Sequence, residues 1–192
     1  IDIPVPQNIP GNNIQSIMDI DWGRTDELTT FDKYDHPWKK WEGTLLGQKD
    51  FRVKYKVETE TVKWRYNSET SGDIEDIPQQ YKDTFNRNQW QLDQDRDGDG
   101  QNDWMIQPRH PQIEDLAEEI VSKEDNLYDK TRAIYEWINQ NIEYERGDEN
   151  LPKHSFWTLQ SREGDCDEQS FLFCSLARAV GVPAWIELGV LY

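Results

Sequence analysis

The chain has 192 residues, which is enough for one well-packed core or for one domain with an extension. It carries 38 acidic and 21 basic residues, a net charge of −17, which argues against binding to nucleic acid or to an anionic membrane surface. No apolar run reaches the roughly 18 residues of a membrane-spanning helix, so we expect no membrane span in this segment.

The N-terminal third predicts little regular structure before a strand. Residues 1–30 are rich in Pro, Asn, Asp and Gly, and residues 1–50 are expected to form an extended arm. From 51 to 57, apolar residues alternate with charged ones, which is the period of a half-buried strand. The alternation changes phase before 62–66, so a bulge or turn is expected around 59–61. We therefore expect a β-rich region over 51–104.

An acidic segment, residues 93–103, predicts a cation site. Carboxylates alternate along it with glycines in the turns, an arrangement that offers an oxygen cage to a hard cation. It resembles the short calcium loops of extracellular proteins, although neither of its registers has the glutamate that an EF-hand places twelfth. Flexible loops favour Ca²⁺ over Mg²⁺, and a solvated acidic turn is the alternative. The candidate ligands are Asp93, Asp95, Asp97, Asp99, Gln101 and Asp103.

The calcium pattern also bears on location. Calcium is plentiful outside cells, so we expect the protein to be extracellular or at the cell surface. We expect a bound ion to have a structural role.

The middle of the chain predicts two helices. Apolar residues at helical spacing predict one helix over 113–120 and a second over 127–142, which opens near Asp125 and Asn126. The polar segment 74–85 is expected to be a loop with a short helical turn.

The C-terminal segment predicts a helix that starts at a cysteine. A Gly-Asp break precedes Cys166 and two acidic residues follow it, as is typical of a helix start. The apolar helical run ends at Gly181, and Pro183 prevents the helix from resuming. Residues 184–192 then predict a buried strand.

Cys166 is the candidate nucleophile. At a helix start, unpaired N–H groups and the positive end of the dipole favour the thiolate and can stabilise an oxyanion. Cys174 lies about 12 Å further along such a helix, whereas a disulfide needs Cα atoms roughly 4.4–6.8 Å apart. We therefore expect no disulfide, with Cys174 as a small core residue. A buried structural thiol is the alternative interpretation of Cys166.

Several motifs occur together in this part of the chain. They lie at 135–144, 158–159, 162–166 and 176–184. In this order and spacing they resemble the transglutaminase-like superfamily over roughly 113–192, and within it the microbial proteins assigned as cysteine peptidases or amidases. The resemblance implies an α+β fold with a papain-like core, in which the helix that carries the nucleophile packs against an antiparallel sheet. It also implies a Cys-His-Asp triad with Cys166 as its nucleophile.

The chain departs from the family pattern after the cysteine. In the family the triad's histidine and aspartate follow the segment that matches 176–184. The three histidines of this chain, His36, His110 and His154, all precede Cys166, and none matches the family's histidine. We expect 105–192 to be the N-terminal half of the catalytic core, incomplete at its C-terminus. The fragment should carry only the nucleophile and be nearly inactive without the C-terminal part of the same polypeptide.

The oxyanion site is expected to have one donor at Cys166 and a second upstream. The backbone N–H of Cys166 is one donor by helix geometry. The resemblance implies a second donor before the cysteine, and Trp157 and Gln160 are candidates by proximity. A packing residue is the alternative interpretation of Trp157, which follows Phe156.

Two function classes therefore compete. The first is a cysteine peptidase or amidase that attacks a peptide or protein amide, forms a thioester and releases it to water or an amine. A peptidase is favoured over a transglutaminase, since no site for an acceptor amine can be read from the sequence. The second is a calcium-stabilised binding module that keeps the fold without the chemistry.

Overall fold

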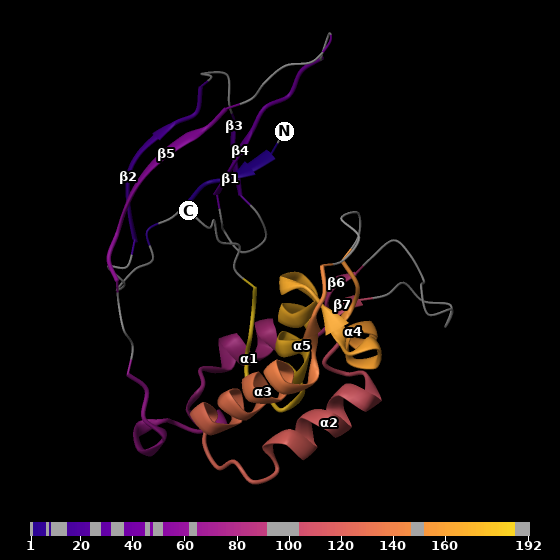
Figure 1. Cartoon of the computed structure of the whole chain (residues 1–192). Helices are drawn as coiled ribbons and strands as arrows, with labels where there is room; N and C mark the ends of the chain where they lie inside the picture. The colour runs from indigo at the N-terminus through magenta and orange to yellow at the C-terminus, as the bar shows by residue number, and fades with distance from the viewer. Residues whose placement is uncertain are drawn as a thin grey trace. The chain divides into compact units, whose positions relative to one another are not determined.

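The chain divides after Arg65 into two units, Ile1–Arg65 and Tyr66–Tyr192 (Figure 1). The structure is a computed structural model. It describes residues 2–6, 8, 15–23, 28–31, 37–44, 47, 52–61, 65–91, 104–146 and 152–186.

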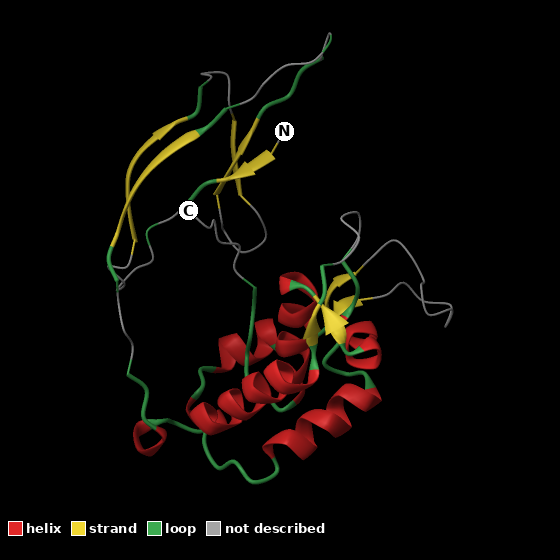
Figure 2. Cartoon of the chain, viewed as in Figure 1, coloured by secondary structure: helices red, strands yellow, loops and turns green. Residues whose placement is uncertain are grey.

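The first unit consists of antiparallel strands (Figure 2). Strands β1 (Asp2–Pro4), β4 (Pro37–Lys40) and β3 (Leu28–Phe31) form one sheet in that order. Strand β2 (Gln15–Asp21) pairs with β5 (Lys54–Thr59) in a second sheet.

These pairings change the expected organisation of the N-terminal third. The predicted extended arm over 1–50 contains paired strands, and the β2–β5 pairing joins it to the following segment in one unit. The strand predicted over 51–57 appears as β5, but all six of its residues are exposed, so the predicted half-buried face is wrong. A two-stranded sheet leaves both faces open to solvent, so alternation alone does not bury one of them. The predicted turn around 59–61 leads into 62–64, which lie outside the described residues.

The second unit contains most of the helices. Its helices are α1 (Gln79–Phe85), α2 (Pro111–Val121), α3 (Leu127–Asn141), α4 (Ser155–Ser161) and α5 (Cys166–Ala179), with 3₁₀ turns at Ser68–Thr70 and Ile74–Asp76. Strand β6 (Gln89–Gln91) pairs antiparallel with β7 (Trp104–Ile106), and β8 (Glu143–Tyr144) pairs parallel with β9 (Glu163–Gly164). The helices predicted at 113–120 and 127–142 are confirmed as α2 and α3. The turn predicted within 74–85 is the longer helix α1.

Two segments near the C-terminus differ from what the sequence predicts. Helix α4 is not predicted by the sequence pattern. Residues 182–186, which follow the last helix, have no regular secondary structure. The remainder of the strand predicted over 184–192 lies outside the described residues. Within the described part of the chain, no helix has the length and apolar character needed to cross a membrane.

Helix α5 lies at the centre of the core of the second unit. Its Leu172, Leu176 and Ala177 are buried against apolar residues of α2, α3 and α4. A second buried cluster joins Phe171 and Cys174 of α5 to Met105 and Ile106 of β7. A helix covered by other helices on one side and by the β6–β7 hairpin on another matches the predicted α+β class, with the cysteine-bearing helix packed against an antiparallel sheet.

Helix α4 begins on a buried polar network in addition to the local cap that His154 provides. The side-chain oxygen of Gln107, just after β7, accepts hydrogen bonds from the Ser155 hydroxyl (3.2 Å) and the Phe156 N–H (3.1 Å). The Gln107 N–H donates to the hydroxyl of Ser175 in α5 (2.9 Å). The network joins β7, α4 and α5, so α4 depends on partners far away in the sequence.

Arg178, near the end of α5, is fully buried. Its Nε donates to the carbonyl of Ala184 (2.7 Å) and its Nη1 to the carbonyl of Arg87 (2.8 Å). A buried charge is tolerated only when its donors are satisfied, and these two bonds run to different segments. Arg178 therefore holds the chain that follows α5 and the turn before β6 against the same helix.

Replacing Arg178 by methionine should lower the free energy of unfolding by about 3 kcal/mol, since two partly buried carbonyls lose charge-assisted hydrogen bonds of roughly 1.5–3 kcal/mol each. Urea unfolding measures the change. Arg109→Met is the matched control, because Arg109 forms an exposed ion pair with Glu114 whose loss should cost about 1 kcal/mol or less. Equal stabilities of the two variants would contradict the role of the buried guanidinium.

Candidate functional site

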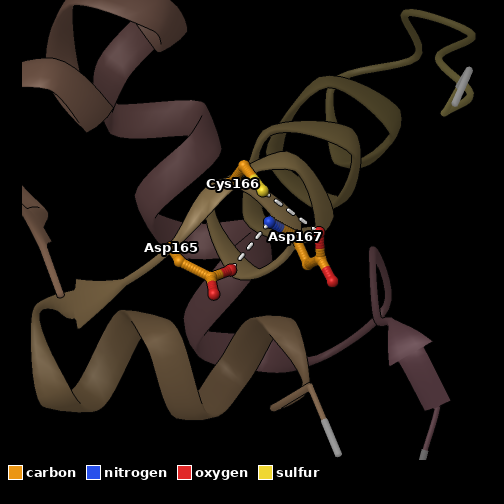
Figure 3. Close-up of side chains that lie close together, drawn as sticks. All are labelled: Asp165, Cys166 and Asp167. Atoms are coloured by element: carbon orange, nitrogen blue, oxygen red, sulfur yellow. Dashed lines mark hydrogen bonds between the residues drawn. The ribbon is translucent and has the colours of Figure 1, made fainter. Parts of the chain in front are cut away.

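Cys166 is the first residue of α5 and is exposed, as predicted. The Asp165 carboxylate accepts a hydrogen bond from the Asp167 N–H (3.1 Å), and Glu168 Oε2 accepts one from the Asp165 N–H (2.9 Å). This capping box satisfies donors that the first turn would otherwise leave without partners. It starts the helix at the cysteine, and Figure 3 shows Cys166 between Asp165 and Asp167.

The turn that leads into Cys166 is closely packed. Glu168 is buried, and its Oε1 accepts a hydrogen bond from the N–H of Lys153, so its carboxylate joins two segments. A Cβ atom at Gly164 would lie only 2.7 Å from the Cβ of Glu168 and 3.3 Å from Cγ2 of Thr158. Contacts below 3.0 Å require a backbone shift, so the approach of β9 to α5 depends on a glycine here.

Cys166 borders a groove of about 470 Å³ in the second unit. One wall is α3, through Tyr135, Ile138 and Asn139, and the other is the face of α5 from Cys166 to Cys174; Tyr144, Trp185 and Ile186 complete it. Gln169 and Ser170 of this face carry no motif that marks them as site residues, and Phe173 is predicted only as part of the apolar face of the helix. Their spacing of three, four and seven from Cys166 is nevertheless the signal that places them beside it.

The charges around the thiol oppose its ionisation. The Cys166 thiol donates a hydrogen bond to Oδ1 of Asp167 (3.3 Å). That bond, together with partial desolvation and the charges of Asp167 and Asp165, raises the pKa of Cys166. The predicted preference of a helix start for the thiolate is therefore outweighed here by two neighbouring carboxylates.

The second cysteine has the predicted structural role. Cys174 is buried, and burial raises the pKa of its thiol to about 11. Both cysteines are free, so the predicted absence of a disulfide between them is confirmed.

The two histidines in the described part of the chain lie at the starts of α4 and α2 and not in the groove. His154 is buried and caps α4, with its Nδ1 accepting a hydrogen bond from the Trp157 N–H (3.1 Å). The ring of His110, the residue before α2, stacks on Phe156 with 3.8 Å between centroids. Neither lines the groove beside Cys166. His36 lies outside the described residues.

The two upstream candidates for the oxyanion site do not line the groove either. The backbone N–H of Trp157 donates a hydrogen bond to His154, and the centroid of the Trp157 ring lies 3.4 Å from the ammonium nitrogen of Lys153. Gln160 donates to Gln112 (2.7 Å) and borders a separate cavity of about 250 Å³. The structure thus brings neither residue to the groove, and a second oxyanion donor is not identified among the described residues.

The predicted calcium ligands cannot be placed. Residues 93–103, with all six candidate ligands, lie outside the described residues. Calcium binding stays a prediction from the sequence.

Substituting Gly164 by alanine should lower the free energy of unfolding by about 1–3 kcal/mol, because the added methyl group overpacks the contact with Glu168. Gly43→Ala is the control, since a Cβ at Gly43 meets nothing within 4 Å. Chemical denaturation of both variants measures the difference. A Gly164→Ala protein as stable as the Gly43→Ala protein would show that the turn accommodates a side chain.

Replacing Asp167 by asparagine should lower the pKa of Cys166, because it removes the charge and the carboxylate hydrogen bond that raise it. The rate of alkylation by iodoacetamide, followed from pH 6 to 10 by mass spectrometry, should then rise at a lower pH than in the unmodified chain. Cys166→Ala measures the small contribution of buried Cys174. An unchanged pH profile would mean that Asp167 does not control the thiol.

Comparisons with known proteins agree with this geometry. Residues 114–192 match the family model of the transglutaminase-like superfamily. A crystal structure described as that of a "putative cysteine protease" from Cytophaga hutchinsonii has a TM-score of 0.55 and 18% sequence identity to this chain. The match covers 95% of this chain but 58% of that protein, and at this identity it shows similarity of fold alone. The comparison with curated proteins finds no match. The resemblance of the motifs is therefore confirmed for residues 114–192, which match the transglutaminase-like superfamily.

Proposed function

We propose that this chain carries the nucleophile of a cysteine peptidase or amidase, and that Cys166 attacks the carbonyl carbon of a peptide or protein amide. The observation that carries the proposal is the position of the thiol. It is exposed at the first residue of a capped helix and borders a groove large enough for a side chain and its flanking backbone.

The chemistry uses this position in two steps. A base takes the thiol proton as Sγ bonds to the carbonyl carbon, and the oxygen becomes an oxyanion near the N–H of Cys166, which has no acceptor within its own helix. The C–N bond then breaks, the amine leaves with the proton returned by the base, and a thioester remains. Water or an amine cleaves the thioester and restores the thiol.

The base and the group that orients it are proposed to be a histidine and an aspartate outside residues 1–192. Two observations support this. Neither described histidine lines the groove, and Asp167 and Asp165 raise the pKa of Cys166, so the thiol needs a base to take its proton. The chain alone is then a poor catalyst, whereas the longer polypeptide has the full triad.

A non-catalytic binding module, stabilised by calcium, is the second candidate. The direction of the pKa shift of Cys166 supports it, because a raised pKa lowers the fraction of the thiol that is present as the nucleophilic thiolate. The proposed Ca²⁺ site and an extracellular or cell-surface location belong to both candidates.

A thiol-reactive acyl probe should distinguish the two. Incubation of this chain with a peptide ester is expected to leave an acyl group on Cys166, found by mass spectrometry, with little turnover. A longer polypeptide should release amine continuously, and Cys166→Ala should reduce that rate about a thousandfold or more. Equal turnover by both forms would show that the base is within this chain. If neither form gains an acyl adduct, and the Cys166→Ala variant has the same rate of amine release, the binding module remains as the candidate function.

A further inference from the structure

The groove beside Cys166 has two chemically different ends. Its α5 wall runs over eight residues from Cys166 to Cys174, or about 12 Å. At the first end, the thiol and the carboxylates of Asp165 and Asp167 have atoms within 4.8 Å of one another (Figure 3). At the other end, Cys174 belongs to a buried apolar cluster against which Ile186 packs. Two carboxylates therefore lie beside the cysteine at one end of the groove, outside its lining, and apolar surface lines the other end.

Exposed aromatic side chains form the open rim of the groove. Tyr135 of α3 is 59% exposed, Tyr144 of β8 is 64% exposed and Trp185 is 50% exposed. The Trp185 ring packs on Phe85, with 4.8 Å between the ring centroids, so Phe85 supports one side of the Trp185 ring. Large aromatic groups exposed together along a groove are typical of a site that binds a partner.

The charges near the groove favour a cationic ligand. Among the described residues that line the groove, none carries a charge at neutral pH. Beyond Asp165 and Asp167, the paired strands β8 and β9 place Glu143 opposite Glu163, and both are exposed. The cation nearest in sequence, Arg162, lies over the ring of Trp137 at 4.8 Å. A basic group on the ligand would complement this negative end.

We propose that the groove binds a peptide that places a lysine or arginine side chain against Asp165 and Asp167, and an apolar or aromatic side chain between Tyr135 and Trp185. An extended peptide rises about 3.3 Å per residue, so the α5 wall of about 12 Å is as long as three to four residues of such a peptide. The inference rests on the proposed function, because it names the substrate class of the same site. The bound cation would also offset the two carboxylates that oppose ionisation of the thiol.

Binding can be measured without chemistry. Fluorescence anisotropy of the Cys166→Ser chain with labelled Lys-Ala-Ala-Phe is compared with Glu-Ala-Ala-Phe and Lys-Ala-Ala-Ala. The lysine–phenylalanine peptide is expected to bind best, and each replacement should weaken binding about fivefold or more. The preference for lysine over glutamate should shrink between 50 and 500 mM NaCl, since salt screens the exposed carboxylates.

Variants separate the two ends. Asp165→Asn retains a good helix cap, and Asp167→Asn keeps the side-chain shape. Each substitution should weaken binding of the lysine peptide about two- to fivefold. Tyr135→Ala should weaken binding of the phenylalanine peptide about fivefold and leave binding of Lys-Ala-Ala-Ala unchanged. Asp115→Asn and Tyr81→Ala are the matched controls, because both residues are exposed and neither lines the groove.

Two outcomes would overturn the inference. The first is equal binding of the lysine and glutamate peptides at low salt. The second is a concentration-dependent dimer, seen by sedimentation, that Tyr135→Ala dissociates, since it would assign the groove to a second copy of the chain. Failure of binding with acylation of Cys166 intact removes this inference alone. Selective binding without acylation supports it and removes the proposed chemistry.

Discussion

The position of Cys166 depends on one buried carboxylate. Glu168 accepts hydrogen bonds from the N–H groups of Asp165 and Lys153, so it ties the start of α5 to the segment before α4. Its side chain also touches the space where Gly164 has no Cβ. These contacts fix the start of the helix at the cysteine, so the thiol lies at the edge of the groove. The position of the thiol and of its two neighbouring carboxylates follows from this one arrangement.

The same cap creates an electrostatic problem for a nucleophile. Asp165 and Asp167 flank the thiol, as acidic residues favour a helix start, yet as charges they raise the pKa of Cys166. The positive end of the α5 dipole acts in the opposite direction, toward a lower pKa. A positive group beside the thiol would act against this shift and favour the thiolate. The acidic cap therefore stabilises the helix and at the same time makes the thiol dependent on its partners.

The groove owes its shape to tertiary contacts at the end of α5. Arg178 is buried and holds the carbonyl of Ala184, which fixes the chain just before Trp185 and Ile186. The parallel pairing of Tyr144 with Gly164 brings the opposite rim to the cysteine. Neither contact lies within one helix, so the groove depends on segments that meet only after the core has formed.

Local patterns determined the helices α2, α3 and α5, the exposed Cys166, the buried Cys174 and the family resemblance, because period, caps and motif spacing are properties of neighbouring residues. The tertiary structure decided helix α4, whose start depends on Gln107, and the pairing of strands within 1–65, because both need partners distant in sequence. The pKa of Cys166 also required the structure. A helix start by itself favours the thiolate, and only the folded position of the Asp167 carboxylate shows that it accepts the hydrogen bond of the thiol and raises its pKa.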